Sequence, residues 1–105
     1  MRCKMKRDVF LPTEEQLARL SVFFKTMGDP TRLRILTALL SEKLCVMHIS
    51  ERVGMSQSAV SHQLAILRAA NLVKVARNGK TQIFAIADEH VRLMLDMALL
   101  HGGEE

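Results

Sequence analysis

The spacing of apolar residues changes from a helical to an extended period beyond the middle of this 105-residue chain. Up to about residue 70 the apolar side chains recur every three or four residues, which is typical of amphipathic helices. Val73 and Val75, and then Ile83 and Ile86, form two short apolar runs around an Arg-Asn-Gly-Lys segment at residues 77–80. Asn-Gly between two such runs indicates a β-hairpin. We therefore expect a mainly helical chain with one small hairpin.

Capping signals predict two helices in the first half. Thr13 opens a capping box that Gln16 completes, and this first helix, with Leu17, Leu20, Phe23 and Phe24 on one stripe, stops near Gly28. Asp29 is then an N-cap, and Pro30 occupies the first helical position. The buried face expected of the second helix consists of Ile35, Leu36, Leu39 and Leu40.

Three further helices follow from similar signals. A short helix at 46–53 ends at Gly54, and Ser56 caps a helix that runs to about Ala70. Its apolar residues, Val60, Leu64 and Leu67, share one face, and Ser58, Ser61, His62 and Ala65 lie opposite. A last helix starts near Asp88 and fades at Gly102-Gly103. The expected order is helix, helix, helix–turn–helix, hairpin, helix, in one domain that spans 1–105.

The formal net charge of +4 is unevenly distributed. Residues 1–29 carry +2, residues 30–87 carry +6, and residues 88–105 carry −4. A basic centre favours a polyanionic partner such as nucleic acid. The acidic end, which also holds two histidines, favours a cationic partner, although solvated helix ends would have the same composition.

Several classes of protein are excluded by what the sequence lacks. Two cysteines are too few for a disulfide scaffold, and we expect neither a secretory leader nor an apolar membrane span. We therefore expect a soluble, cytoplasmic protein with no membrane partner. Ser61 and His62 are adjacent on a helix and diverge, so they form no nucleophile–base pair, and no glycine-rich phosphate loop occurs. We expect no enzyme and no small-molecule substrate.

Helices joined at Gly54 and capped by Ser56 meet the requirements of a helix-turn-helix. Small residues on the outer face of the second helix allow it to enter a major groove, where hydroxyl and amide groups contact phosphates or base edges. Arg77 and Lys80 flank the hairpin tip, where a wing would meet backbone phosphates. Periodicity alone leaves a second interpretation open, namely a three-helix bundle with an incidental polar face.

Three segments carry a resemblance to a known family. DPTRLRIL at 29–36, SQSAVSHQL at 56–64 and LRAANLV at 67–73 resemble the ArsR/SmtB metal-responsive repressors, and the likeness extends from about Glu14 to His101. It implies a winged helix-turn-helix that dimerises through its terminal helices, with 1–12 as a flexible basic arm and 88–105 as the dimerisation and metal-binding helix. Such a homodimer would bind double-stranded operator DNA and release it when metal binds. The DNA-contacting residues implied are Ser56, Gln57, Ser58, Ser61, His62 and Gln63 in the recognition helix and Arg77 and Lys80 in the wing.

Candidate metal ligands lie at both ends of the last helix, at Asp88, His90, His101 and Glu104. The two histidines are eleven residues apart, which places them nearly in phase but about 16 Å apart along the axis. One ion cannot bridge that gap, so the spacing allows either two symmetric sites between antiparallel helices of a dimer or no site. The resemblance favours the first, because Asp-x-His-x10-His-x2-Glu/His is the zinc site of this family. Zn(II) or Co(II) would then be a regulatory ligand, not a catalytic one.

Two alternatives remain open. Cys45 and His48 lie three residues apart, so they can chelate together, and Cys3 of the arm could join them in a soft-metal site for Cd(II), Pb(II) or As(III). Cys45 could instead be simply a buried apolar residue. From a different class, the chain could be a ligand-independent winged-helix DNA-binding or interaction module, with its last helix serving only dimerisation.

Overall fold

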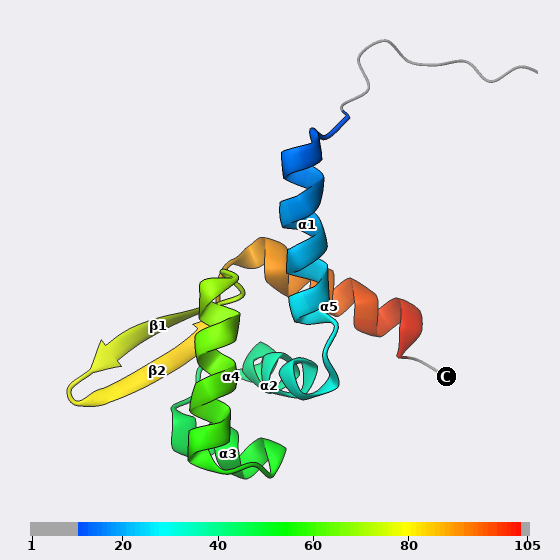
Figure 1. Ribbon diagram of the computed structural model, residues 1–105. Coiled ribbons are helices and arrows are strands. Elements are labelled where there is room, and N and C mark those ends of the chain that lie inside the picture. Colours follow the sequence, from blue (N-terminus) through cyan, green and yellow to red (C-terminus); the bar gives the residue numbers. More distant parts are fainter. Residues whose placement is uncertain (1–10, 104–105) are drawn as a thin grey trace, which may run out of the picture.

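The computed structural model describes residues 11–103. In chain order the elements of this part are α1 (Glu14–Met27), α2 (Pro30–Ser41), α3 (Val46–Val53), α4 (Gln57–Ala69), β1 (Val73–Asn78), β2 (Thr81–Ile86) and α5 (Glu89–Gly102). Figure 1 shows the hairpin of β1 and β2 projecting on one side, whereas α1 and α5 cross on the other. The predicted order of helices and hairpin is confirmed.

The helix starts follow from local hydrogen bonds. Thr13 Oγ1 accepts from the backbone N–H of Gln16 at 3.0 Å, and Gln16 Oε1 accepts from the N–H of Thr13 at 2.8 Å, so both halves of the capping box are present. Asp29 accepts from the N–H of Arg32 at 3.1 Å, directly before Pro30. These bonds satisfy N–H groups that have no partner inside the helix.

The turn between α3 and α4 depends on a left-handed residue. Gly54 has φ 71° and ψ 37°, and its N–H donates to the Ser50 carbonyl at 2.9 Å. Glycine adopts this conformation without the steric penalty that a Cβ would add. Ser56 then caps α4 by accepting from the N–H of Ala59 at 3.1 Å. The predicted helix-turn-helix is therefore formed from the predicted residues.

The hairpin turns one residue later than the Asn-Gly motif predicts. Asn78 pairs with Thr81, so the two turn residues are Gly79 and Lys80. Gly79 has φ 69°, whereas neither Asn78 nor Lys80 has a positive φ. A type I′ turn centred on Asn-Gly would require positive φ at both residues, whereas a type II′ turn requires it only at the first, which here is Gly79.

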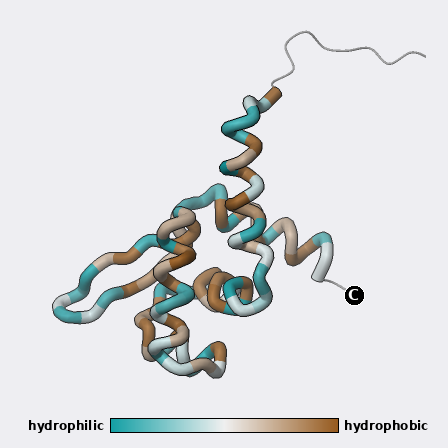
Figure 2. The backbone as a smooth tube through the Cα atoms, in the orientation of Figure 1, coloured by the Kyte–Doolittle hydropathy of each residue, from teal (hydrophilic) through white to brown (hydrophobic). Residues whose placement is uncertain are grey.

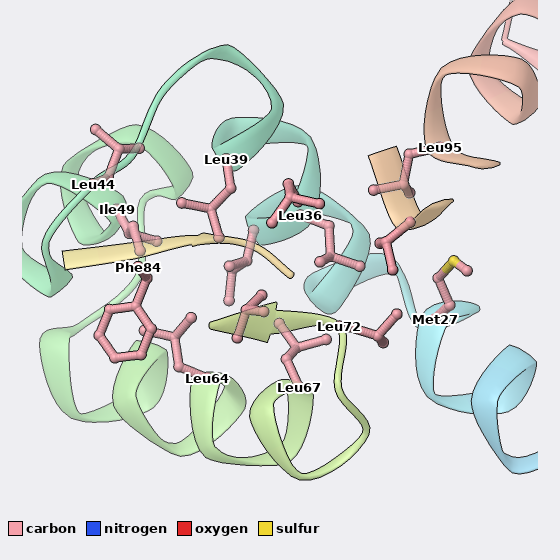
Figure 3. Packing of buried hydrophobic residues seen from close by; sticks show 14 of the residues in the cluster. Met27, Leu36, Leu39, Leu44, Ile49, Leu64, Leu67, Leu72, Phe84 and Leu95 are labelled. Carbon is pink, nitrogen blue, oxygen red and sulfur yellow. The ribbon is translucent and has the colours of Figure 1, made fainter. Parts of the chain in front are cut away.

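The core lies between α2, α3, α4 and the hairpin. In Figure 3, the ring of Phe84 of β2 lies beside Leu64 of α4 and points away from Ile49 of α3, and Leu36 and Leu39 of α2 lie above them. Most of the predicted core residues are buried, but Leu40 is only half-buried. The hairpin is attached to this core by a short bridge, in which Leu44 and Phe84 exchange two backbone hydrogen bonds of 3.0 and 2.8 Å.

Much of the apolar surface of the terminal helices is exposed. Figure 2 marks the apolar positions along α1 and α5 in brown. The exposed fractions are 44–53% for Leu17, Leu20 and Phe24 and 51–64% for Leu93, Met97 and Leu100. Only Met27 of α1 is buried, and α5 contributes Val91 and Leu95. The stripe predicted on α1 is therefore left largely uncovered by the chain's own core. None of the described helices is long and apolar enough to cross a membrane.

Candidate nucleic-acid interface and metal-ligating residues

The exposed face of α4 is small and polar. Gln57, Ser58, Ser61 and His62 are all exposed, whereas Val60, Leu64 and Leu67 on the opposite face are at most 1% exposed. This division follows from the helical spacing of the apolar residues, which turns the others outward. Ser56, just before the helix, uses its hydroxyl as the N-cap and lies 3.4 Å from the hydroxyl of Ser58.

Gln63 differs from the other residues predicted to contact DNA. It is half-buried, and its Oε1 accepts a hydrogen bond from Nε of Arg32 at 3.0 Å. Its carbonyl oxygen is therefore turned toward α2 rather than toward the open face of α4. Sequence spacing did not reveal this, because the partner lies 31 residues away.

Arg77 and Lys80 lie at the projecting end of the hairpin and are exposed. Two further polar residues, Arg68 and Gln82, line a cleft between α4 and β2 together with Ser61. The sequence interpretation missed both. Arg68 was detectable, since it follows Ser61 by seven residues and so lies on the same helical face.

The predicted metal ligands fall into separate groups. His90 Nδ1 lies 3.6 Å from Asp88 Oδ1 at the start of α5, and the His90 side chain is 89% exposed. The same Asp88 oxygen accepts from the N–H of Val91 at 3.0 Å, so the carboxylate also acts as the helix cap. His101 lies in the last turn of α5, and Gly103 is the C-cap of that helix. Glu104 lies outside the described residues.

Within residues 11–103 of one chain, no three histidine, cysteine, aspartate or glutamate side chains cluster closely enough to hold a metal ion. Asp88 and His90 supply an oxygen and a nitrogen, which are ligand types that Zn(II) accepts. At 100° per residue, His101 lies only about 20° from His90 around the helix, on the face that also exposes Leu93 and Met97. In the described part of a single chain, Asp88 and His90 therefore supply two of the four ligands that a tetrahedral Zn(II) site requires.

The cysteine–histidine pair is brought together. Cys45 Sγ lies 3.4 Å from His48 Nδ1 at the start of α3. Cys45 is half-buried and free, and although it is the N-cap residue of α3, its side chain makes no hydrogen bond to the backbone N–H groups of that helix. Cys3 lies outside the described residues, as does most of the predicted basic arm.

Sequence comparison places the chain among known regulators. The family model described as "Bacterial regulatory protein, arsR family" matches residues 29–75. The HTH-type transcriptional regulator NmtR of Mycobacterium tuberculosis is 40% identical over 91 residues, which cover 86% of this chain and 76% of NmtR. The chain belongs to the ArsR/SmtB family. A transcriptional repressor SmtB homolog of Synechocystis sp. is 43% identical over 77 residues, which cover 73% of the chain and 58% of that relative.

Solved structures of ArsR/SmtB-like proteins share the fold. HlyU of Vibrio cholerae matches with a TM-score of 0.79 and 32% identity, over 88% of this chain and 100% of that one. A homodimeric winged helix-turn-helix DNA-binding domain of Mycobacterium bovis matches with a TM-score of 0.81 and 25% identity, over 89% of each chain. The chain is therefore a winged helix-turn-helix, with α4 as the recognition helix and the hairpin as the wing. HlyU is named a transcriptional activator, so proteins of this fold are not all repressors.

Proposed function

We propose that this ArsR/SmtB protein is a metal-sensing transcriptional repressor. It binds operator DNA as a homodimer and is released when Zn(II) or Co(II) binds between the two α5 helices. The observation that carries the proposal is the separation of two surfaces. The polar face of α4 and the basic wing lie on one part of the chain, and α5 exposes an apolar stripe with an imidazole at each end.

The DNA-binding half of the proposal rests on α4 and the wing. Ser58, Ser61 and His62 are short enough to let α4 enter a major groove and polar enough to contact base edges. Arg77 and Lys80 are placed at the wing tip, where cations contact phosphates. Two recognition helices about one helical turn apart would read a palindromic site.

The dimer half rests on the uncovered apolar stripes of α1 and α5. Leu17 and Phe24 on α1, and Met97 and Leu100 on α5, are each 44–64% exposed, which is unfavourable for a chain that remains alone in water. A two-fold axis across antiparallel α5 helices would bring the His90 end of one helix to the His101 end of the other. A neighbour of known structure that is itself homodimeric supports a dimer.

A bound Zn(II) or Co(II) ion would supply two positive charges that link the two α5 helices. Asp88 and His90 of one protomer and His101 of its partner would hold the ion, with Glu104 as the expected fourth ligand. For release to follow, the DNA-free dimer must hold metal more tightly than the DNA-bound dimer, and DNA must weaken metal binding by the same factor. A coupling of about 3 kcal/mol corresponds to roughly 150-fold in operator affinity.

A titration followed by fluorescence anisotropy tests the proposal. Labelled operator DNA bound to the protein is titrated with Zn(II), Co(II) and Cd(II). We expect Zn(II) and Co(II) to release DNA from the wild type and from Cys45→Ser, but not from His90→Ala plus His101→Ala. His48→Ala is the matched control, because it removes an imidazole away from α5. Zinc release that survives loss of both α5 histidines would contradict the assigned site.

A second candidate function is a soft-metal sensor that uses Cys3, Cys45 and His48. The observation in its favour is the 3.4 Å approach of Cys45 Sγ to His48 Nδ1. Loss of the metal response in Cys45→Ser alone, with Cd(II) more effective than Zn(II), would favour this candidate. DNA binding that no metal changes would favour the ligand-independent winged-helix module. HlyU, a relative of similar fold, is named a transcriptional activator, with no metal in its name.

A further inference from the structure

Arg32 connects three helices through one side chain. It lies in the first turn of α2, and its Nε donates to Gln63 Oε1 of α4 at 3.0 Å. Its Nη1 donates to the carbonyl oxygen of Thr26, in the last turn of α1, at 3.4 Å. The planar guanidinium fixes the angle between these two acceptors, because its N–H groups point in set directions.

The charge of Arg32 is not used in an ion pair within residues 11–103, where the paired cations are Arg19, Arg52, His90 and Arg92. Asp29 is close in sequence, but its carboxylate accepts from the backbone N–H of Arg32. The guanidinium of Arg32 is half-buried and donates its two hydrogen bonds to neutral oxygens. Its main effect is therefore to hold these acceptors in fixed directions, and not to pair with a negative charge.

Gln63 receives this hydrogen bond at the edge of the packed face of α4. The residues that pack this helix on the core are aliphatic, and include Val60, Leu64 and Leu67. Aliphatic contacts set how closely two helices approach but define the rotation of a helix about its axis only loosely, since they have no preferred direction. A hydrogen bond is directional and can define that rotation.

We propose that Arg32 and Gln63 are a positioning pair that sets the rotation of α4 relative to α1. The inference rests on the proposed DNA-binding function, because this rotation decides where Ser58, Ser61 and His62 meet the bases. Surface atoms lie roughly 5–6 Å from a helix axis, so a rotation of about 20° moves them by about 2 Å. A shift of that size breaks a hydrogen bond to a base edge. Gln63 is then an anchor of α4 and not a base-reading residue.

The link to Thr26 gives the pair a second role. Thr26 lies in the last turn of α1, the helix whose exposed stripe the proposed dimer covers. The pair therefore fixes the rotation of α4 relative to α1. In the proposed dimer, α1 would also help to set the distance between the two recognition helices. Loss of the pair should weaken sequence-specific binding in particular, because non-specific binding depends on phosphate charge and tolerates a misaligned helix.

The experiment compares specific with non-specific binding. The wild-type protein first selects a duplex from a random-sequence library, and anisotropy then gives the affinity of each variant for that duplex and for an unrelated one. We expect Arg32→Met to lower the ratio of the two affinities about tenfold. Arg34→Met is the matched control, because Arg34 is exposed on the same helix and its side chain makes no hydrogen bond or ion pair within 11–103. It should leave the ratio unchanged.

A double-substitution cycle separates positioning from direct contact. If Arg32 acts through Gln63, Gln63→Leu should lower the ratio as Arg32→Met does, and the double variant should be no worse than either single one. Losses that add would overturn the inference. The inference would also be overturned if, in Arg32→Met alone, the slope of log specific binding constant against log salt concentration became less steep by about 0.9. That change would indicate that Arg32 had contacted a phosphate.

Circular dichroism establishes which variants fold. If Arg32→Met does not, Gln63→Glu and Gln63→Leu still decide the question. Gln63→Glu keeps an acceptor for Arg32 and should retain the ratio, whereas Gln63→Leu should not. Equal loss in both would overturn the inference. A wild-type protein that enriches no sequence from the library would contradict the proposed DNA-binding function, and this inference with it.

Discussion

Gly54 is a single residue on which the geometry of the helix-turn-helix depends. Its φ of +71° is strained for any residue with a Cβ, but a Cβ built there would meet nothing within 4 Å. Gly54→Ala should therefore lower the free energy of unfolding by about 1 kcal/mol, through backbone strain alone. Urea unfolding measures it. Gly102→Ala is the matched control, since Gly102 has equally open space and a helical φ, and it should cause no loss.

The two wing cations offer a second test at this scale. Each of Arg77→Ala and Lys80→Ala should weaken binding to every duplex. Each should also make the slope of log binding constant against log salt concentration less steep by about 0.9, which is the change expected for one lost phosphate contact. Lys74→Ala is the control on the same hairpin, because Lys74 is exposed and lines a cleft with residues of α5, at the opposite end from the tip. If Lys74→Ala changed the salt dependence of DNA binding as much as the two tip variants do, a specific role for the tip would be contradicted.

Residue-level prediction from the sequence succeeded where the signal was local. Ser58, Ser61 and His62 were assigned to the open face of α4 by helical spacing, and they are exposed. Gln63 was grouped with them because the family resemblance assigns Ser56 to Gln63 to the recognition helix, but its side chain accepts a hydrogen bond from Arg32, 31 residues away. No local sequence pattern predicts a partner at that separation, so the hydrogen bond became visible only in three dimensions.

Among the elements, α5 is joined to α2 by one charged hydrogen bond. Nη1 of Arg92 donates to the Leu40 carbonyl at 2.8 Å, where it satisfies an end of α2 that lacks a basic residue of its own. Arg92→Met should lower the free energy of unfolding by about 1 kcal/mol, measured by urea unfolding at fixed protein concentration. Arg19→Met is the control, because its ion pair with Glu15 is 3.6 Å long and exposed, and it should change little.

The elements themselves were largely predictable, because helix caps are local. Each cap side chain accepts a hydrogen bond from the backbone N–H three residues later. Thr13, Asp29, Ser56 and Asp88 all cap the helices that the sequence assigned to them. The predicted position of the hairpin turn was wrong by one residue. The local preference of Asn-Gly for a turn competes with the strand register, which depends on pairing along both strands. The packing of α1 and α5 on the rest of the chain was not predictable from local patterns, because most apolar side chains on these two helices are exposed and do not pack in the core.

For the whole molecule, the exposed stripe of α5 predicts the assembly state. Met97→Glu plus Leu100→Glu places two charges on that stripe, so we expect sedimentation to show a monomer and operator affinity to fall at least about a hundredfold, as the two recognition helices no longer bind together. Met47→Glu is the matched control for assembly, since Met47 is a similarly exposed methionine on α3. An unchanged dimer in the α5 variant would contradict the proposed interface.

The bridge between Leu44 and Phe84 divides the hairpin into two parts with different freedom to evolve. Near this bridge, β2 is bonded to β1 on one edge and to the α2–α3 connection on the other, so an inserted residue would disrupt both. Beyond it, toward Gly79 and Lys80, the strands pair only with each other. Each residue added to both strands there lengthens the hairpin by about 3.4 Å. Descendants of this chain could thus change how far they reach along a duplex by tip insertions alone, with the rest of the fold left as it is.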